Sequence, residues 1–376
     1  MSNDQIFDEA FKQHGGIEDF SNINGGKNFF HINLEELQFS LSLAQASYPN
    51  VPKVHLAFVS NIGLNAGAIK YKDQYFIGVY MGLLSSAFDM FDKMLASRNV
   101  LPGVGDPSLE SDEKFTLNLQ LEGASFISTI GDKVTPKDPV RRGTSLYYVG
   151  LLLEFIVYHE FGHILRGHCG YLHEKSKSAI WMENAPGEQI DKMGKEFFFA
   201  CEMDADSFSV YSMLNKTKKH LQDPSSISQE AKEFLTSWEK AVFDLTFVLF
   251  SFFRLGDLVY KDHVNVTHPA PFIRMSVINN LIAQQFDGRF KGLANADDIR
   301  MAVMKGVVIA EKAFVEVTYA ETQIDKIKAI ENEDARATRD SLLYHWNLAR
   351  PKLEPFALGE LPPLIDIPPG FVPKAL

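Results

Sequence analysis

Long apolar stretches dominate the chain, and short polar segments that contain glycine and proline separate them. Several of these stretches exceed ten residues, which is typical of helices rather than of strands. The strong strand signal, short runs rich in β-branched and aromatic residues, is confined to residues 54–80. The pattern therefore predicts an α+β protein that is mostly α-helical, with one small antiparallel sheet.

Capping residues and prolines mark the expected elements. Asn33 offers an N-cap with Glu36 three residues later, so a helix is expected from about Leu34 to Ser47. Strands are expected at Val54–Ser60, Ala66–Tyr71 and Tyr75–Tyr80, followed by a helix that starts at Met81. Further helices are expected over residues 145–167, 188–214, 226–255, 272–286, 296–322 and 323–349, with loops over residues 98–114 and 171–187 and a break over residues 215–225.

The apolar stretch around residue 160 contains the run His159-Glu160-Phe161-Gly162-His163. Two histidines four residues apart lie nearly one above the other on a helix, so both imidazoles can hold one metal ion. Glu160 stands beside such an ion, where it can accept a proton from a metal-activated water. This H-E-x-x-H pattern is typical of zinc hydrolases, usually peptidases.

The alternative, a solvated helix face, conflicts with the apolar residues on both sides of the run. The apolar segment Leu151–Val157, which only Glu154 interrupts, precedes the run, and Ile164 and Leu165 follow it. Buried histidine and glutamate side chains need polar partners, and a zinc ion would supply them.

A catalytic zinc site needs a third protein ligand. A third histidine at the spacing H-E-x-x-H-x-x-G-x-x-H is excluded, because the chain has Arg166 and Cys169 at the two diagnostic positions. His168 stands one place early and is expected to be a helix-terminal histidine or a partner behind the ligands. The two cysteines, Cys169 and Cys201, exclude a disulfide framework, and each is either a small buried side chain or an alternative thiolate ligand.

A carboxylate is the favoured third ligand. Glu202 and Asp206 are spaced i, i+4 in an apolar, phenylalanine-rich run, whereas Asp204 points to another side. Two carboxylates among phenylalanines are costly to bury unless they meet a cation. We expect Glu202 on the zinc and Asp206 bonded to the far nitrogen of a ligand histidine.

Four sequence elements together resemble the gluzincin peptidases, which include the CAAX-prenyl proteases and the bacterial heat-shock membrane protease. The elements are residues 65–84, His159–His163, Glu202–Asp206 and Thr267–Arg274. A fainter similarity is to phage-exclusion peptidases of the Lit type. The resemblance implies a zincin-like metallopeptidase fold, with the small antiparallel sheet beside the H-E-x-x-H helix.

The resemblance also implies an activity, that of a zinc-dependent endopeptidase with one Zn²⁺ per chain. Its substrate would be a peptide or protein whose extended backbone pairs with a strand. The implied roles are zinc ligands for His159, His163 and Glu202, general base for Glu160, oxyanion stabilisation for His268, supporting contacts for Asp206 and Arg274, and substrate binding for Gly78, Val79 and Tyr80.

Composition divides the chain further. Residues 1–32 form a polar extension expected to be loosely ordered or draped on the surface, and residues 33–290 form the metallopeptidase domain, with an insert at about 98–143. A helical part covers residues 291–349. The tail, residues 350–376, holds seven prolines, so extended structure is expected there, with the tail wrapped on the body, disordered, or docked in a cleft.

The formal net charge of −11 argues against nucleic acid or an anionic membrane as the main partner. The N-terminus lacks an apolar signal core, and residues 147–165 and 242–253 are too charged or too short to span a bilayer. A cytoplasmic protein without a membrane span is expected.

Two alternatives to the peptidase remain open from the sequence. One is a zinc-bearing binding or regulatory protein, whose site is structural or is blocked by the tail or by residues 98–143. The other is a hydrolase that acts on something other than peptides. A fourth protein ligand would favour the regulatory protein, and an open coordination position would favour the enzyme.

Overall fold

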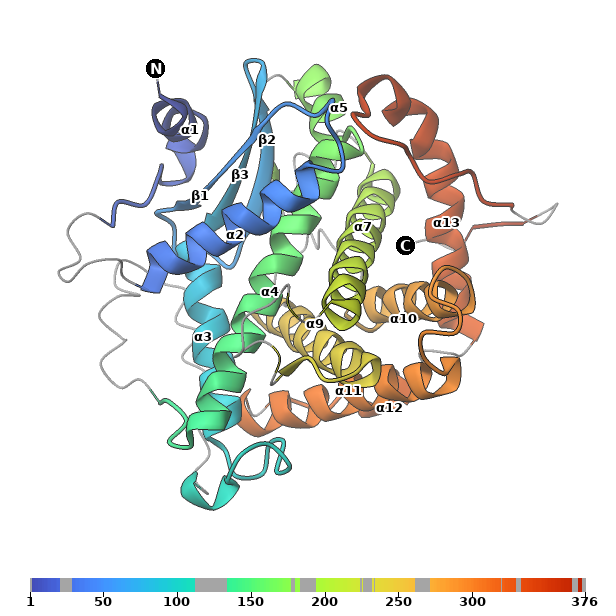
Figure 1. Ribbon diagram of the computed structural model, residues 1–376. Helices are drawn as coiled ribbons and strands as arrows, with labels where there is room; N and C mark the ends of the chain where they lie inside the picture. The colour runs from blue at the N-terminus through green and yellow to red at the C-terminus, as the bar shows by residue number, and fades with distance from the viewer. Residues whose placement is uncertain are drawn as a thin grey trace.

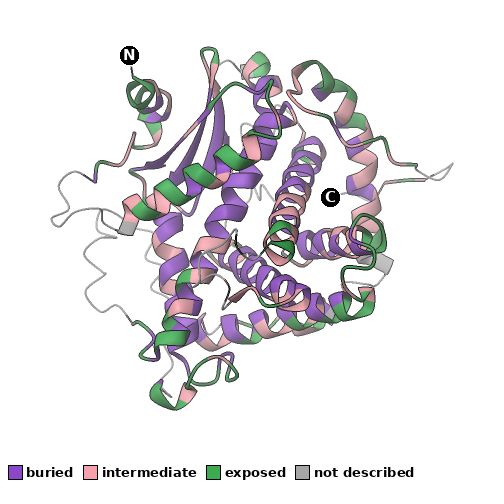
Figure 2. Ribbon diagram, viewed as in Figure 1, coloured by how far each residue is buried: buried purple, intermediate pink, exposed green. Residues whose placement is uncertain are grey.

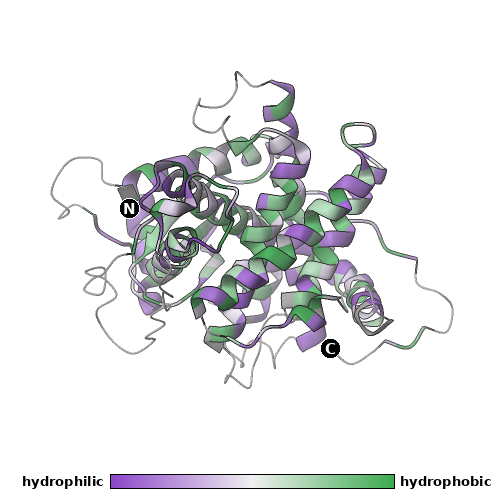
Figure 3. Cartoon of the chain, turned by 90° about the horizontal axis from the view of Figure 1, so that it is seen from below, coloured by the Kyte–Doolittle hydropathy of each residue, from purple (hydrophilic) through white to green (hydrophobic). Residues whose placement is uncertain are grey.

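The computed structural model describes residues 2–20, 29–111, 134–176, 180–182, 194–223, 225, 232, 234–260, 271–318, 320–328, 333–366 and 371–373. The fold is mostly helical with one small sheet, as expected for an α+β protein. In Figure 1 helix α4 (Pro139–Leu165) runs through the middle of the molecule, between α3 (Met81–Ala96) and α7 (Lys195–Gln222). Figure 2 shows that much of α4 and α7 is buried, and Figure 3 shows hydrophobic residues concentrated on the central helices.

The sheet contains β1 (Val54–Val59), β2 (Ala66–Tyr71), β3 (Gln74–Tyr80) and β4 (Trp181–Met182), in the order β1-β3-β2-β4. The three long strands lie where the sequence predicts them. The predicted antiparallel sheet is wrong, because β1 runs parallel to β3 while β2 is antiparallel to both β3 and β4. A tight turn at Lys72, whose φ is 55°, pairs β2 with β3, and β1 then pairs with the other side of β3 while β4 pairs with the other side of β2. Side-chain alternation predicts a strand but does not specify its neighbour.

Of the two alternatives for the N-terminal extension, loosely ordered or draped on the surface, residues 2–20 show the second. A capping box starts helix α1 (Asn3–Phe11). Phe7 and Phe11, one turn apart, are fully buried against the outer face of the sheet. Residues 16–18 then bond to the outer edge of β1. The inner face of the sheet packs on the main core, which α4 and α2 (Phe29–Gln45) cover.

Helix α4 begins before the predicted residue 145 because Asp138 caps it by accepting a hydrogen bond from the backbone N–H of Arg141. The helix ends at Leu165, and Gly167, whose φ is 84°, turns the chain. Helix α5 (His168–Ser176) follows directly, so the loop predicted to start at residue 171 is wrong for its first residues.

Helix α7 continues through Asn215, where the sequence predicts a break. The Asn215 side chain donates to the backbone oxygen of Tyr211 one turn earlier, so it does not interrupt the helix. Small residues bring α7 close to α4. A Cβ atom added to Gly162 would lie only 3.4 Å from Cα of Ala205 and 3.2 Å from the Phe208 ring. The two helices therefore cross where the predicted site residues lie.

The remaining helices cover the lower and right-hand parts of Figure 1. They are α9 (Trp238–Tyr260), α10 (Pro271–Asp287), α11 (Ala296–Thr318), α12 (Ile324–Lys328) and α13 (Glu333–Leu353). The single helix predicted over residues 323–349 is wrong, because α12 and α13 are separate elements. None of the described helices is both long and apolar enough to cross a membrane.

The first part of the predicted tail lies on the body of the molecule. The backbone N–H groups of Leu358 and Gly359 donate to the carbonyl of Leu165 at the end of α4. The Asn347 side chain bonds to both backbone groups of Ile365. Residues 354–366 are therefore wrapped on the body at the end of α4. The extended structure predicted for the whole tail is wrong for residues 350–353, which still belong to α13, and for Glu354–Phe356, which form a 3-10 helix.

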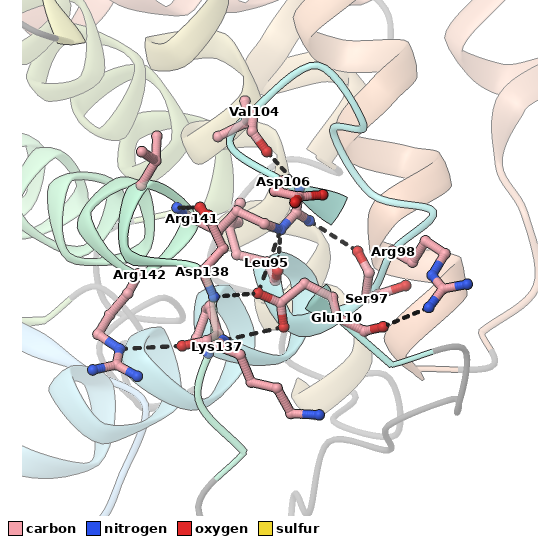
Figure 4. A network of polar contacts seen from close by, with 12 residues as sticks. Leu95, Ser97, Arg98, Val104, Asp106, Glu110, Lys137, Asp138, Arg141 and Arg142 are labelled. Carbon is pink, nitrogen blue, oxygen red and sulfur yellow. Dashed lines mark hydrogen bonds and ion pairs between the residues drawn. The ribbon is translucent and has the colours of Figure 1, made fainter. Parts of the chain in front are cut away.

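The buried Arg141 anchors the described parts of the predicted insert, residues 98–111 and 134–143. Beside Arg141, Glu110 accepts hydrogen bonds from the backbone N–H groups of residues 137 and 138 (Figure 4). This network lies at the first turn of α4, roughly 27 Å along the helix from His159 at 1.5 Å per residue. The Arg141 guanidinium donates at 2.6–3.0 Å to the carbonyls of Leu95, Ser97, Val100, Leu101 and Val104.

Candidate metal centre

The two histidines of the H-E-x-x-H run lie on one face of α4. Both side chains are fully buried. Nε2 of His159 lies 3.0 Å from Nε2 of His163. The Nδ1 atom of each ring is hydrogen-bonded elsewhere. Two imidazole nitrogens this close can share a proton or face a common cation.

Glu202 brings a carboxylate to the same place from α7. Its Oε2 lies 3.3 Å from Nε2 of His159, and its Oε1 lies 3.5 Å from Nε2 of His163. Candidate ligand atoms of the three residues all lie within 4.8 Å of one another. The structure thus brings together the three residues that the sequence predicts as ligands.

The three residues fit a zinc ion in both chemistry and spacing. Two imidazoles and one glutamate are a donor set that catalytic zinc sites use. Tetrahedral bonds of about 2.0–2.1 Å put neighbouring ligand atoms about 3.3 Å apart. The three separations measured here, from 3.0 to 3.5 Å, bracket that value.

Asp206 orients His159, as the sequence predicts. Its Oδ1 lies 3.0 Å from Nδ1 of His159, and Arg274 on α10 donates to both carboxylate oxygens at 2.7 and 2.9 Å. The guanidinium also lies over the Phe253 ring, 3.9 Å from its centroid. Burial alone would raise the pKa of Asp206, but Arg274 and His159 outweigh it and lower that pKa. Asp206 is therefore an anion that favours a proton on Nδ1 and leaves Nε2 for a ligand bond.

His168 contacts the second ligand histidine. Its Nδ1 lies 2.8 Å from Nδ1 of His163. On its other side, Nε2 of His168 lies 3.5 Å from Oδ2 of Asp204, which is 3.7 Å from Nε of Arg166. His168 is fully buried and is the first residue of α5, so it lies at a helix end, as one of the two expected roles has it. Its contact with His163 also places it behind a candidate ligand, which was the other expected role.

Trp181 is a site residue that the sequence analysis missed. Its indole Nε1–H donates to Oε1 of Glu202 at 2.6 Å, and its ring stacks on His163 with centroids 4.8 Å apart. It belongs to β4, which is held by β2 and packs its tryptophan on Phe198. A lone tryptophan in a polar segment carries no spacing that could have revealed this role.

Glu160 is fully buried next to His159 and lies outside the ligand group. Burial, together with the nearby Glu160 carboxylate, raises the pKa of the Cys169 thiol well above its usual value. Burial also raises the pKa of the Cys201 thiol. Neither cysteine joins the ligand group among the residues described. Both thiols are therefore small buried side chains, which was one of the two roles expected.

The predicted substrate strand is wrong. Gly78, Val79 and Tyr80 lie on β3, which is hydrogen-bonded to β1 on one side and β2 on the other. A central strand has no backbone groups left for a substrate. The spacing of the run predicted a strand but could not show that it is central. His268, predicted to stabilise the oxyanion, falls outside the described residues.

Comparison of the chain with protein family models, with curated proteins and with solved structures finds no match. The geometry of the site is thus the basis for a functional argument.

Proposed function

We propose that the protein is a zinc-dependent endopeptidase. One observation carries the proposal, the convergence of Nε2 of His159, Nε2 of His163 and the Glu202 carboxylate within 4.8 Å, with Glu160 adjacent in the motif. The peptide as substrate class is supported by the resemblance of His159–His163 and Glu202–Asp206 to the gluzincin motifs.

In this proposal His159, His163 and Glu202 hold the ion, and Asp206 and Trp181 keep His159 and Glu202 in position. Zinc supplies Lewis acidity, which makes water a nucleophile near neutral pH and polarises the scissile carbonyl. Glu160 accepts the proton of the attacking water and returns it to the departing amine.

The test uses the zinc-loaded chain and its Glu160→Gln variant in cleavage profiling of a cell lysate, read as new peptide N-termini by mass spectrometry. The variant should keep its zinc and lose about 10²–10⁴-fold in rate, the usual contribution of a general base. The control is Glu174→Gln, the same change at an exposed position on α5, which should cleave like the parent. Equal cleavage by Glu160→Gln and parent would exclude Glu160 as the base.

A second candidate, a zinc-bearing regulatory protein with a closed site, is favoured by one observation. The side chains of His159, His163 and Glu202 are all buried, and Trp181 lies against two of them. The lysate experiment separates the two functions. A zinc-loaded parent that produces no Glu160-dependent cleavage supports the regulatory protein and overturns the peptidase.

A further inference from the structure

We infer that His168 and Asp204 are positioning residues that fix the ring of His163 in the tautomer that binds zinc. The inference rests on the zinc site of the proposed function, but it does not depend on hydrolysis. It concerns a chain of contacts that runs from His163 through His168 to Asp204 and Arg166.

The contact between the two histidines requires one donor and one acceptor. Nδ1 of His163 and Nδ1 of His168 lie 2.8 Å apart, so one of them carries the shared hydrogen. If Nδ1 of His163 carries it, Nε2 of His163 keeps a lone pair that points toward His159 and Glu202. If Nδ1 of His168 carries it, a neutral His163 has its proton on Nε2, where it cannot bind a metal. The tautomer of His168 therefore decides whether His163 is a ligand.

Asp204 selects between these two tautomers. Its Oδ2 lies 3.5 Å from Nε2 of His168. The two atoms lie at ion-pair distance without forming a hydrogen bond, and a buried carboxylate at that distance favours the tautomer of His168 with its proton on Nε2. Nδ1 of His168 then has a lone pair and accepts from His163.

The elements that hold this chain explain why it stays in place. His163 and Asp204 belong to the crossing helices α4 and α7, and His168 starts α5 just after the turn at Gly167. His168 and Asp204 are 0% and 4% exposed, so bulk water competes little for the hydrogen bond between His168 and His163 and screens the Asp204 carboxylate little. The ring of Trp181 lies 5.3 Å from that of His168 and restricts its rotation. The chain parallels the contacts of the other ligand histidine, in which Asp206 and Arg274 orient His159.

The first test measures zinc affinity by competition with a chromophoric chelator for the parent and for three variants. His168→Leu removes the acceptor and should weaken zinc binding by about 10–100-fold, the usual effect of losing such a partner. His168→Asn keeps an oxygen near the place of Nδ1 and should recover most of that loss. Asp204→Asn lets an amide donate to His168, which favours the wrong tautomer, so it should also bind zinc more weakly than the parent.

The second test reads the tautomers directly. Long-range ¹H–¹⁵N correlation spectra of the zinc-loaded parent, labelled with ¹⁵N-histidine, should show His168 protonated on Nε2 and His163 protonated on Nδ1. Circular dichroism of the metal-free variants controls for folding.

Three results would overturn the inference. They are zinc affinity of His168→Leu equal to that of the parent, affinity of His168→Asn as low as that of His168→Leu, and a His168 ring protonated on Nδ1. A parent chain that binds no zinc would overturn the proposed function together with this inference. A parent that binds zinc, with His168→Leu binding it equally well, would overturn this inference alone.

Discussion

At the scale of single residues, the site depends on buried charges that compensate one another. Asp206 is an anion in the core because Arg274 donates to both of its oxygens and His159 contacts it. Breaking such a buried pair by removing one partner leaves an uncompensated charge, whereas removing both can be nearly neutral. Arg274 therefore matters for stability even without zinc.

We expect Arg274→Leu to lower the free energy of unfolding of the metal-free protein by about 3–5 kcal/mol at pH 7. The pKa of Asp206 is lowered in the folded parent, so its stabilising contribution is complete above the unfolded pKa and is lost as pH falls through the folded pKa. The difference between variant and parent should therefore shrink below about pH 4. Urea denaturation at several pH values measures it.

The matched control is Arg300→Leu, which removes an arginine from an exposed pair and should cost less than about 1 kcal/mol. The double variant Arg274→Leu, Asp206→Leu should regain part of the stability, because no charge remains buried alone. Equal losses for Arg274→Leu and Arg300→Leu would show that the Asp206 pair does not carry this energy.

Sequence patterns reveal polar residues that would be costly to bury in the apolar segments where they occur. His159, His163, Glu202 and Asp206 are polar groups at helical spacing inside apolar segments, so their convergence could be predicted. Trp181 could not, because its contact with Glu202 depends on the pairing of β4 with β2. The contact of His168 with His163 likewise depends on the turn after α4.

At the scale of elements, polar contacts fix how helices pack on α4. Tyr148 on α4 donates to the Asp244 carboxylate on α9 at 3.0 Å, and Lys240 pairs with the same carboxylate one turn earlier on α9. Burial raises the pKa of Asp244 even though Lys240 and Tyr148 act to lower it. The protein interior therefore disfavours the ionised form of Asp244 more than bulk water does.

We expect Asp244→Asn to be at least as stable as the parent at pH 7. A carboxyl group whose folded pKa is raised binds protons more readily when folded, so its contribution is lost as pH rises through the folded pKa. The advantage of the variant should therefore vanish toward about pH 4, the ordinary range of aspartate. Thermal unfolding from pH 4 to 8 measures this, with Asp366→Asn, an exposed position, as the control. A variant that is less stable than the parent at pH 7 would contradict the argument.

The sequence predicts where the helices and strands lie along the chain better than it predicts how they pair and pack. The strand positions and the motif helix agree with the structure within a few residues, because alternation and apolar runs are local. The parallel pairing of β1 with β3 is not local and depends on which surfaces are buried once the chain has folded. The break predicted at residue 215 is wrong for a local reason, because the Asn215 side chain bonds to the backbone oxygen of Tyr211 within α7.

At the scale of the whole molecule, distant segments meet at one end of α4. Helix α7 supplies Glu202, β4 supplies Trp181, and α10 supplies Arg274. Residues 354–366 cap the last turn of the same helix, while the described parts of the insert at about 98–143 bind its first turn.

The central claim is that this convergence holds zinc. X-ray absorption at the zinc edge, on the purified chain after loading and removal of excess metal, tests it most directly. The account predicts one zinc per chain with two imidazole nitrogens and light oxygen donors, all at about 2.0–2.2 Å. A sulfur donor at about 2.3 Å, or a chain that retains no zinc, would contradict it.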